Sequence, residues 1–498
     1  MPARFDTLIR EVSLYDGSGA PARLADVALR AGRIEAIGAV TGEARESVDG
    51  SGLALAPGFI DVHTHDDFAA VMHADMAFKL VGGVTTCIVG NCGFGAAPFA
   101  AAMVMAKTLH PKLDLPPWEG YAGYARVLER NPPGVNVGLL VGHGTARLAA
   151  MGPGNRPPSG AEMTAMKAIV SEGLEAGALG LSSGLVYDPG RFAATEELIE
   201  LASVLRGSGA LYATHMRDEG SRLLESVREA IRIGDAAGVP VQISHHKASG
   251  RTAWGLVGES LKLIEAAQRR GLDVHADQYP YTAGSTILSA VFRDGKLRGV
   301  LGDLRPEDVV IASTARHPEW EGKSIAALAG AMGRTAEEAA ARILTGDSGV
   351  TVVLHAMSEE DVRTVMRHPS TMIGSDGIPT LEGKPHPRLY GTFARVLGRY
   401  ARDEGLFPLE EAVFRMTGFP AAKFGLRDRG VVKEGAHADL VLFDPHRIID
   451  RGTFDEPHLP PDGIEAVYVN GVKAIAGGRP TGARGGRVLR RASMHAPA

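Results

Sequence analysis

The stretch Gly58-Phe-Ile-Asp-Val-His-Thr-His65 combines a short apolar β-strand with two histidines at its end. Seven further apolar runs follow along the chain, and helix-length segments separate most of them. This alternation is typical of repeated βα units. The predicted strands are residues 58–63, 85–89, 135–141, 177–181, 211–215, 239–245, 273–278 and 371–376. Eight such strands predict an α/β protein with a (β/α)8 TIM-like barrel over residues 57–427.

One connection is longer than a crossover needs, the segment between residues 278 and 371. It contains two strand-like runs, at 308–312 and 350–354, and an alanine-rich helical segment at 324–344. We therefore predict an inserted subdomain at about residues 285–350, placed where it can exclude water from the barrel mouth.

The two ends of the chain have a different sequence pattern, with short β-like runs separated by turns. Residues 1–56 and 428–480 each contain such runs, and Asn470-Gly471 is a strong hairpin signal. Neither segment can bury a core alone, so we predict one small β-sandwich built from both. Residues 481–498 read as a docked or disordered tail.

Composition narrows the class of partner. The chain has 498 residues, a net charge of −5 and two cysteines. With no basic field, nucleic acid and anionic membranes are disfavoured, and a small-molecule substrate is expected. We found no apolar leader and no run near the ~18 residues of a membrane span, so we expect a cytoplasmic protein. The oligomeric state cannot be predicted.

Potential metal ligands lie at the ends of the predicted barrel strands, where a barrel forms its active site. They are His63 and His65 after strand one, Cys92 after strand two, His215 after strand five, His245 after strand six and Asp376 after strand eight. One histidine at a strand end is more often structural, but the joint pattern predicts a metal site. Cys87, within its strand, is expected to be a buried hydrophobe.

Strand alternation refines this set. His63 and His65 project to the same face of their strand, so both can approach one cation. Of the adjacent His245 and His246, one faces inward together with Lys247. We choose His245, because Ile243 two residues earlier suits an inward barrel position.

A thiolate with two imidazoles favours zinc, and three protein ligands with an open position are typical of catalytic sites. This predicts a site formed by Cys92, His215 and His245. Asp376 can then act as general base toward a water activated by the metal, so hydrolysis is the expected reaction.

A family resemblance rests on five motifs. They are Pro57-Gly-Phe-Ile-Asp-Val-His-Thr-His65, Gly90-Asn-Cys-Gly93, Ala213-Thr-His-Met-Arg-Asp-Glu219, Ile243-Ser-His-His-Lys247 and Ile373-Gly-Ser-Asp376. The first resembles the first-strand signature of the amidohydrolase superfamily. The others resemble the N-acyl-D-amino-acid deacylase (D-aminoacylase) branch, over residues of about 5–480.

The resemblance implies one tightly bound zinc on Cys92, His215 and His245. It also implies a weaker second metal position near His63, His65 and Asp376. The substrate carboxylate would be held by residues matching Lys247, Tyr279, Arg388 and Ser285. These offer a point charge, a neutral donor and a planar fork that suit a carboxylate.

We therefore expect a zinc hydrolase that cleaves N-acyl-D-amino acids to a carboxylate and a free D-amino acid, with Asp376 as general base and acid. Within the enzyme class, the alternative is an amidohydrolase acting on dipeptides with a C-terminal D-residue or on cyclic amides. A non-catalytic binding barrel is the remote alternative. The sequence leaves the side-chain and acyl preferences open.

Overall fold

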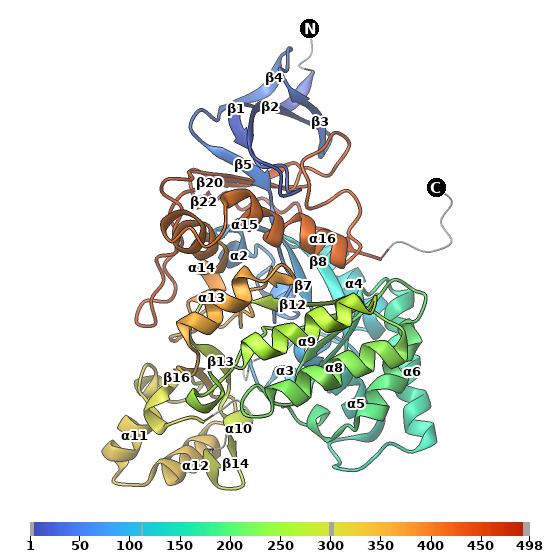
Figure 1. Cartoon of the computed structure of the whole chain (residues 1–498), viewed down its shortest axis with the longest axis vertical. Helices are drawn as coiled ribbons and strands as arrows, with labels where there is room; N and C mark the ends of the chain where they lie inside the picture. Colours follow the sequence, from blue (N-terminus) through green and yellow to red (C-terminus); the bar gives the residue numbers. More distant parts are fainter. Residues whose placement is uncertain (1–3, 111–112, 298–302, 492–498) are drawn as a thin grey trace.

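A computed structural model describes residues 4–110, 113–297 and 303–491 of the chain. Figure 1 shows three parts along the long axis of the molecule. A β-sheet formed by both ends of the chain lies at the top, the barrel lies in the middle, and the inserted segment with α11 and α12 lies at the bottom.

The barrel confirms the predicted fold class. Its parallel strands follow the order β18-β12-β11-β10-β9-β8-β7-β6, and a bridge between Thr64 and Gly377 brings its two edges together. The strands are β6 (Phe59–Asp61), β7 (Val84–Val89), β8 (Asn136–Gly142), β9 (Gly180–Gly184), β10 (Leu211–His215), β11 (Val241–Ile243), β12 (Val274–Gln278) and β18 (Thr371–Ile373).

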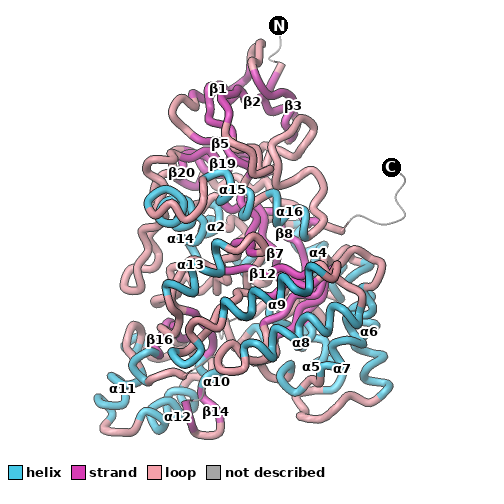
Figure 2. Tube along the Cα trace, viewed as in Figure 1, coloured by secondary structure: helices cyan, strands magenta, loops and turns pink. Residues whose placement is uncertain are grey.

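Helices cover the outside of the barrel, and Figure 2 shows α8 and α9 packed over its strands. The helices of this layer and its connections are α1 (Ala69–Met72), α2 (Ala77–Leu80), α3 (Phe99–Ala106), α4 (Gly120–Arg130), α5 (His143–Met151), α6 (Gly160–Glu175), α7 (Thr195–Ala202), α8 (Leu223–Ala237), α9 (Val257–Arg269), α13 (Glu359–Arg367), α14 (Arg388–Arg395), α15 (Leu409–Met416) and α16 (Gly418–Lys423). The helices bury their apolar stripes on the strands, as a barrel requires.

Several strands differ from their predicted bounds at the ends that face the site. The run 239–245 is a strand only over β11, and the run 371–376 only over β18. His245 and Asp376 have φ angles of 37° and 51°, which an extended strand does not allow. The run predicted at 177–181 is displaced to β9, because Gly177, with φ of 96°, still belongs to the preceding turn.

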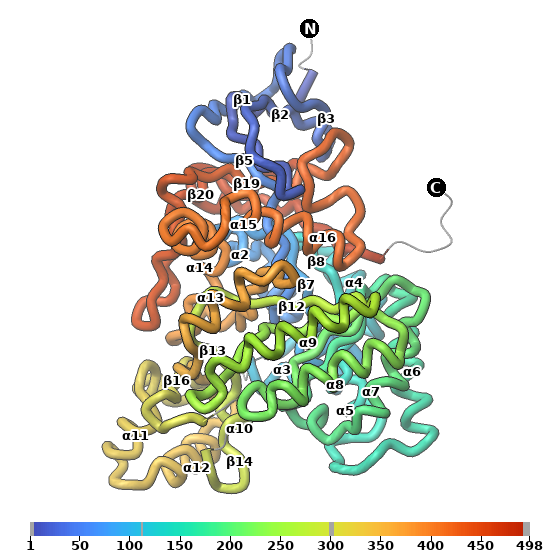
Figure 3. Tube along the Cα trace, viewed as in Figure 1, coloured from blue at the N-terminus to red at the C-terminus, as the bar shows by residue number. Residues whose placement is uncertain are grey.

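The terminal segments form one nine-stranded sheet, in the order β22-β21-β20-β19-β5-β1-β2-β3, with β4 paired to β1. The predicted sandwich thus takes the form of a single sheet, whose strands β1, β2, β5 and β19 contribute to a shared core. Figure 3 shows β5 from the amino-terminal segment, in blue, beside β19 and β20 from the carboxy-terminal segment, in orange to red. The strands are β1 (Phe5–Leu14), β2 (Arg23–Arg30), β3 (Arg33–Gly38), β4 (Ala44–Asp49), β5 (Ala54–Pro57), β19 (Leu440–Phe443), β20 (Ile464–Val469), β21 (Val472–Ala476) and β22 (Arg479–Pro480).

The insertion has its own small sheet, in the order β13-β17-β16. The alanine-rich segment forms two helices rather than one, because Gly333 ends the first in the left-handed conformation. The elements are β13 (Gly284–Ile287), α10 (Leu288–Val291), β14 (Phe292–Arg293), β15 (Lys296–Leu297), β16 (Val309–Ser313), α11 (Ile325–Met332), α12 (Ala336–Gly346) and β17 (Thr351–Leu354). Its apolar side chains form a separate core around Val309, Ile325 and Val352.

The tail predicted at 481–498 is described as far as residue 491. Within it, β23 (Val488–Leu489) pairs in parallel with β8, which attaches it to the barrel. Residues 492–498 lie outside the described part of the chain.

Among the described helices, none has the length and apolar character needed to cross a membrane.

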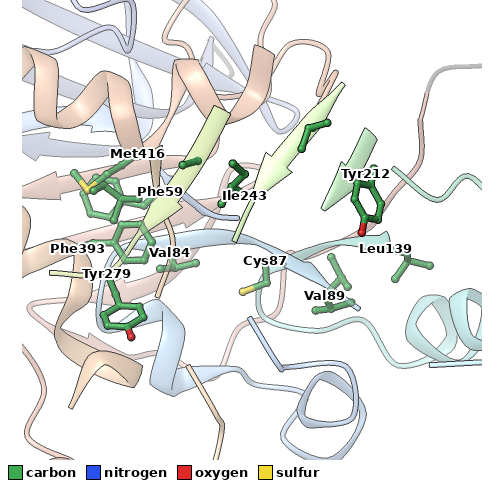
Figure 4. Packing of buried hydrophobic residues seen from close by; sticks show 14 of the residues in the cluster. Phe59, Val84, Cys87, Val89, Leu139, Tyr212, Ile243, Tyr279, Phe393 and Met416 are labelled. Carbon is green, nitrogen blue, oxygen red and sulfur yellow. The ribbon is translucent and has the colours of Figure 1, made fainter. Parts of the chain in front are cut away.

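The main core lies between the barrel strands and their helices. Figure 4 shows Phe59, Cys87, Tyr212 and Ile243 among its members. Cys87 is fully buried there, as expected of a small hydrophobe, and burial raises the pKa of its thiol well above the ordinary value. The ring of Phe59 stacks on that of Phe393, with centroids 5.4 Å apart.

Phe59→Ala should lower the free energy of unfolding by about 3–5 kcal/mol, because it removes a buried stacked ring and leaves a cavity. Urea denaturation followed by circular dichroism measures the change. Leu24→Ala is the control, since Leu24 is 75% exposed and its loss should change stability by less than about 0.5 kcal/mol. Equal unfolding midpoints for the two variants would contradict this account of the core.

Candidate metal centre and active site

Three side chains from distant parts of the chain converge at the mouth of the barrel. The Sγ atom of Cys92 lies 3.7 Å from His215 Nδ1 and 3.7 Å from His245 Nε2. The two ring nitrogens are 2.9 Å apart. Cys92 follows β7, His215 ends β10 and His245 follows β11, so each comes from the carboxyl end of a different strand.

The donor set fits zinc. Typical zinc bond lengths and tetrahedral angles place sulfur and nitrogen ligands about 3.5 Å apart and two nitrogens about 3.3 Å apart. The observed separations are close to these values, and all three side chains are buried. A buried thiolate and two imidazoles held this close are a ready set of ligands for a divalent cation.

A second group of potential ligands lies beside the first. His63 Nε2 is 3.3 Å from Cys92 Sγ and 3.5 Å from Asp376 Oδ1, and His65 Nε2 is 3.2 Å from the same carboxylate oxygen. Ligand atoms of His63, His65 and Cys92 all lie within 4.8 Å of one another. The second position therefore adjoins Cys92 as well as Asp376.

The backbone at these residues is unusual. Cys92, His245 and Asp376 have φ angles of 54°, 37° and 51°, in the left-handed region that non-glycine residues seldom adopt. Such conformations concentrate at functional sites, where the surroundings hold the side chain in place. The carboxylate of Asp61 provides one such support, because it accepts the backbone N–H and the hydroxyl of Ser375, next to Asp376.

Electrostatics favour the ionised ligands. Burial would raise the pKa of the Cys92 thiol, but the neighbouring His63, His215 and His245 hold it well below its ordinary value. Burial would also raise the pKa of Asp376, yet Arg388 and the histidines hold it well below the usual range. Thiolate and carboxylate are the forms that bind metal and accept protons.

The adjacent histidines contact different neighbours, although both lie beyond the end of β11. His245 faces Cys92, whereas His246 Nε2 lies 2.8 Å from Ser260 Oγ of α9.

The four residues predicted to contact the substrate lie close together. Lys247 Nζ and Arg388 Cζ are 5.7 Å and 4.4 Å from the centroid of the Tyr279 ring, and an Arg388 nitrogen donates to the backbone oxygen of Ser285.

A cavity of about 30 Å³ lies where the metal ligands meet Lys247, Tyr279 and Ser285. Its lining includes His215, His245, Lys247, Tyr279, Ser285 and Asp376, together with Leu354 and Met357 from the insertion side. One contact was not predicted, an ion pair of 2.9 Å between Arg388 Nη1 and Asp376 Oδ2. Arg388 is almost fully buried, and its Nε atom has no hydrogen-bond partner among the described residues.

Two buried carboxylates behind the histidines escaped the sequence analysis. Asp277 Oδ1 lies 3.3 Å from His63 Nδ1 and accepts the backbone N–H of His245. Glu219 Oε1 lies 3.0 Å from His245 Nδ1 and 2.8 Å from Lys247 Nζ. Asp277 could have been found as a further acidic residue near a strand end. Glu219 lies in a loop, four residues after His215, and no strand rule singles it out.

The fold and the ligand set define a barrel of the metal-dependent hydrolase class. The amidohydrolase family model matches residues 46–474. D-aminoacylase of Alcaligenes xylosoxydans xylosoxydans is 42% identical over 496 residues, which cover 98% of each chain. The chain belongs to the amidohydrolase family.

Solved structures agree with this assignment. The N-acyl-D-glutamate deacylase of Bordetella bronchiseptica, in complex with zinc and a phosphonate mimic of the tetrahedral intermediate, has a TM-score of 0.89 at 39% identity and covers 98% of this chain and 99% of its own. A D-aminoacylase studied for its binuclear metal centre, with one-metal activation and second-metal attenuation, has a TM-score of 0.88 at 39% identity, with 98% and 100% covered.

Cys92→Ala should weaken zinc binding by more than about 100-fold, because loss of a supporting partner outside the ligand shell already costs 10–100-fold. Chelator competition on the folded protein measures this affinity. Cys87→Ala is the matched control, since it removes the other cysteine, which lies in the core, and should leave zinc affinity unchanged. Equal zinc affinity in both variants would show that Cys92 is not a ligand.

Proposed function

We propose that this chain is a metal-dependent hydrolase that cleaves the amide bond of N-acyl-D-amino acids, releasing a carboxylate and the free D-amino acid. The observation that carries the proposal is one cavity lined by His215, His245, Lys247 and Asp376. Cys92 contacts the two histidines, and Arg388 forms an ion pair with Asp376. The names of the relatives, D-aminoacylase and N-acyl-D-glutamate deacylase, support the substrate class.

Zinc held by Cys92, His215 and His245 is the proposed cofactor, with a weaker second metal near His63, His65 and Asp376. The donor chemistry supports zinc in the first position. The zinc complex of the Bordetella relative and the binuclear centre of D-aminoacylase support both parts. A bound zinc ion supplies Lewis-acid polarisation and lowers the pKa of water.

Asp376 is the proposed general base and acid. Its carboxylate lies between His63, His65 and Arg388, so it is held at the cavity in its ionised form. It accepts a proton from the attacking water and then donates that proton to the leaving amine nitrogen. Both transfers need one carboxylate within hydrogen-bond reach of the scissile amide.

Lys247, Tyr279, Arg388 and Ser285 are proposed to bind the substrate carboxylate. The buried Nε donor of Arg388, which has no partner among the described residues, supports this role, because a buried guanidinium N–H favours a carboxylate acceptor. When this carboxylate and the amide carbonyl are both fixed, only one direction remains for the substrate side chain. Selection of the D-enantiomer follows from that geometry.

The insertion is proposed to exclude water. Gly284, Ser285 and Thr286 of β13 line the cavity, and Leu354 of β17 completes this wall.

The proposed partner is a small molecule. A cytoplasmic location is proposed too, and the two free cysteines, Cys87 and Cys92, support a reducing compartment.

A panel of N-acetyl-D-amino acids, their L-enantiomers, dipeptides with a C-terminal D-residue, and hydantoins tests the reaction on zinc-loaded protein. We expect hydrolysis of the N-acetyl-D-amino acids, far slower turnover of the L-enantiomers, and loss of activity after chelation that added zinc restores. Preference for hydantoins or dipeptides would favour the alternative amidohydrolase reactions. Zinc binding without turnover of any member would favour a binding barrel.

Asp376→Asn should lower kcat by about 10²–10⁴-fold, the range for loss of a general acid–base. Steady-state kinetics and zinc analysis measure the two properties separately, and zinc should remain on Cys92, His215 and His245. Asp361→Asn is a control, since Asp361 is a buried carboxylate of α13 that accepts from the backbone of Gly255. An Asp376→Asn protein with most of its rate intact would exclude the proposed base.

A further inference from the structure

Glu219 has an exceptional position for a residue outside the ligand set. It is fully buried in the loop after β10, and both of its carboxylate oxygens face the metal ligands from behind. Oε1 lies 3.0 Å from His245 Nδ1, and Oε2 lies 3.8 Å from His215 Nε2. One carboxylate thus lies within hydrogen-bond distance of the rear nitrogen of His245 and within 4 Å of that of His215.

The front nitrogens of the same rings face Cys92. These are Nδ1 of His215 and Nε2 of His245, so the two rings present opposite nitrogens to the metal position. A neutral imidazole that binds a metal through one nitrogen carries its hydrogen on the other. In His245 this nitrogen is within hydrogen-bond distance of Glu219, and in His215 it has Glu219 Oε2 at 3.8 Å and no hydrogen-bond partner among the described residues.

We propose that Glu219 is a positioning residue, whose single carboxylate orients both imidazole ligands of the metal and fixes which nitrogen of each ring faces it. The inference rests on the metal site of the proposed function and not on its substrate. Carboxylates that accept from metal-bound histidines fix the ring orientation and increase its basicity as a ligand.

Lys247 adds a reason for a negative charge at this position. Its Nζ atom lies 2.8 Å from Glu219 Oε1 and also 2.8 Å from His245 Nδ1. An ammonium group so close to an imidazole N–H is repulsive, and the carboxylate that contacts both groups offsets that repulsion. Glu219 therefore connects the metal ligands with the cation proposed to bind the substrate.

A simpler role for Glu219 is that of a counter-ion that keeps Lys247 buried. That role predicts a loss of stability when Glu219 is changed, but no loss of metal affinity in the molecules that remain folded. Zinc affinity of the folded protein therefore separates the two roles, and it is measured without substrate.

Glu219→Gln keeps the shape of the side chain and removes its charge. We expect a 10–100-fold weaker zinc affinity by chelator competition, the range for loss of such a partner. We also expect a changed visible spectrum of the Co²⁺-substituted protein, which reports the arrangement of the ligands. Glu197→Gln is the matched control, since Glu197 is also a buried carboxylate beside a histidine and a cation, His143 and Arg147. It should keep wild-type affinity and spectrum.

Wild-type zinc affinity in Glu219→Gln, or an equal loss in Glu197→Gln, would overturn the proposal. If Glu219→Gln does not fold, Glu219→Asp decides, because it keeps the charge but withdraws it by one methylene. Weaker zinc binding in folded Glu219→Asp supports positioning, and unchanged binding overturns it. Failure of the wild-type protein to hydrolyse N-acyl-D-amino acids would refute the proposed function and leave this result intact.

Discussion

A buried thiolate surrounded by imidazoles is the constraint on which the rest of the structure depends. Cys92 cannot hold a negative charge in the protein interior unless partners from other strands reach it. His215 and His245 provide those partners only when β7, β10 and β11 stand in one register around the barrel. A slip of one residue in a strand would turn its ligand away from the mouth. The packing of the barrel and the chemistry of the site therefore depend on the same strand register.

The charges around the metal position are balanced in a way that matches a divalent cation. The buried anions are Cys92, Glu219, Asp277 and Asp376, and the cations beside them are Lys247 and Arg388. With neutral histidines, this set carries two uncompensated negative charges. Such an excess is costly in a low-dielectric interior. A bound divalent cation would offset it, which gives a physical reason for so many ionisable groups buried in one place.

The sequence predicted the barrel and the residues now found at its mouth because both follow from local patterns. Apolar runs of strand length mark β6 to β12 and β18, and polar side chains at their ends mark the candidate ligands. Local patterns could not predict the ion pair between Arg388 and Asp376. The two residues lie in α14 and in the loop after β18, and only the tertiary packing brings them together. Glu219 was missed for the same reason. The left-handed conformations of His245 and Asp376 end two strands earlier than predicted. The residue type alone does not predict a positive φ at these positions.

The shared terminal sheet has a consequence for how the chain is made. Strands β1 and β5 pair with one another, but β5 also needs β19 on its other side, and nearly 400 residues separate these two partners in the sequence. During synthesis, β5 is made long before β19 and must wait for it before this edge is covered. An uncovered apolar edge over that interval is a site for association with other nascent chains, so a chaperone that protects the amino-terminal strands would raise the yield of native protein.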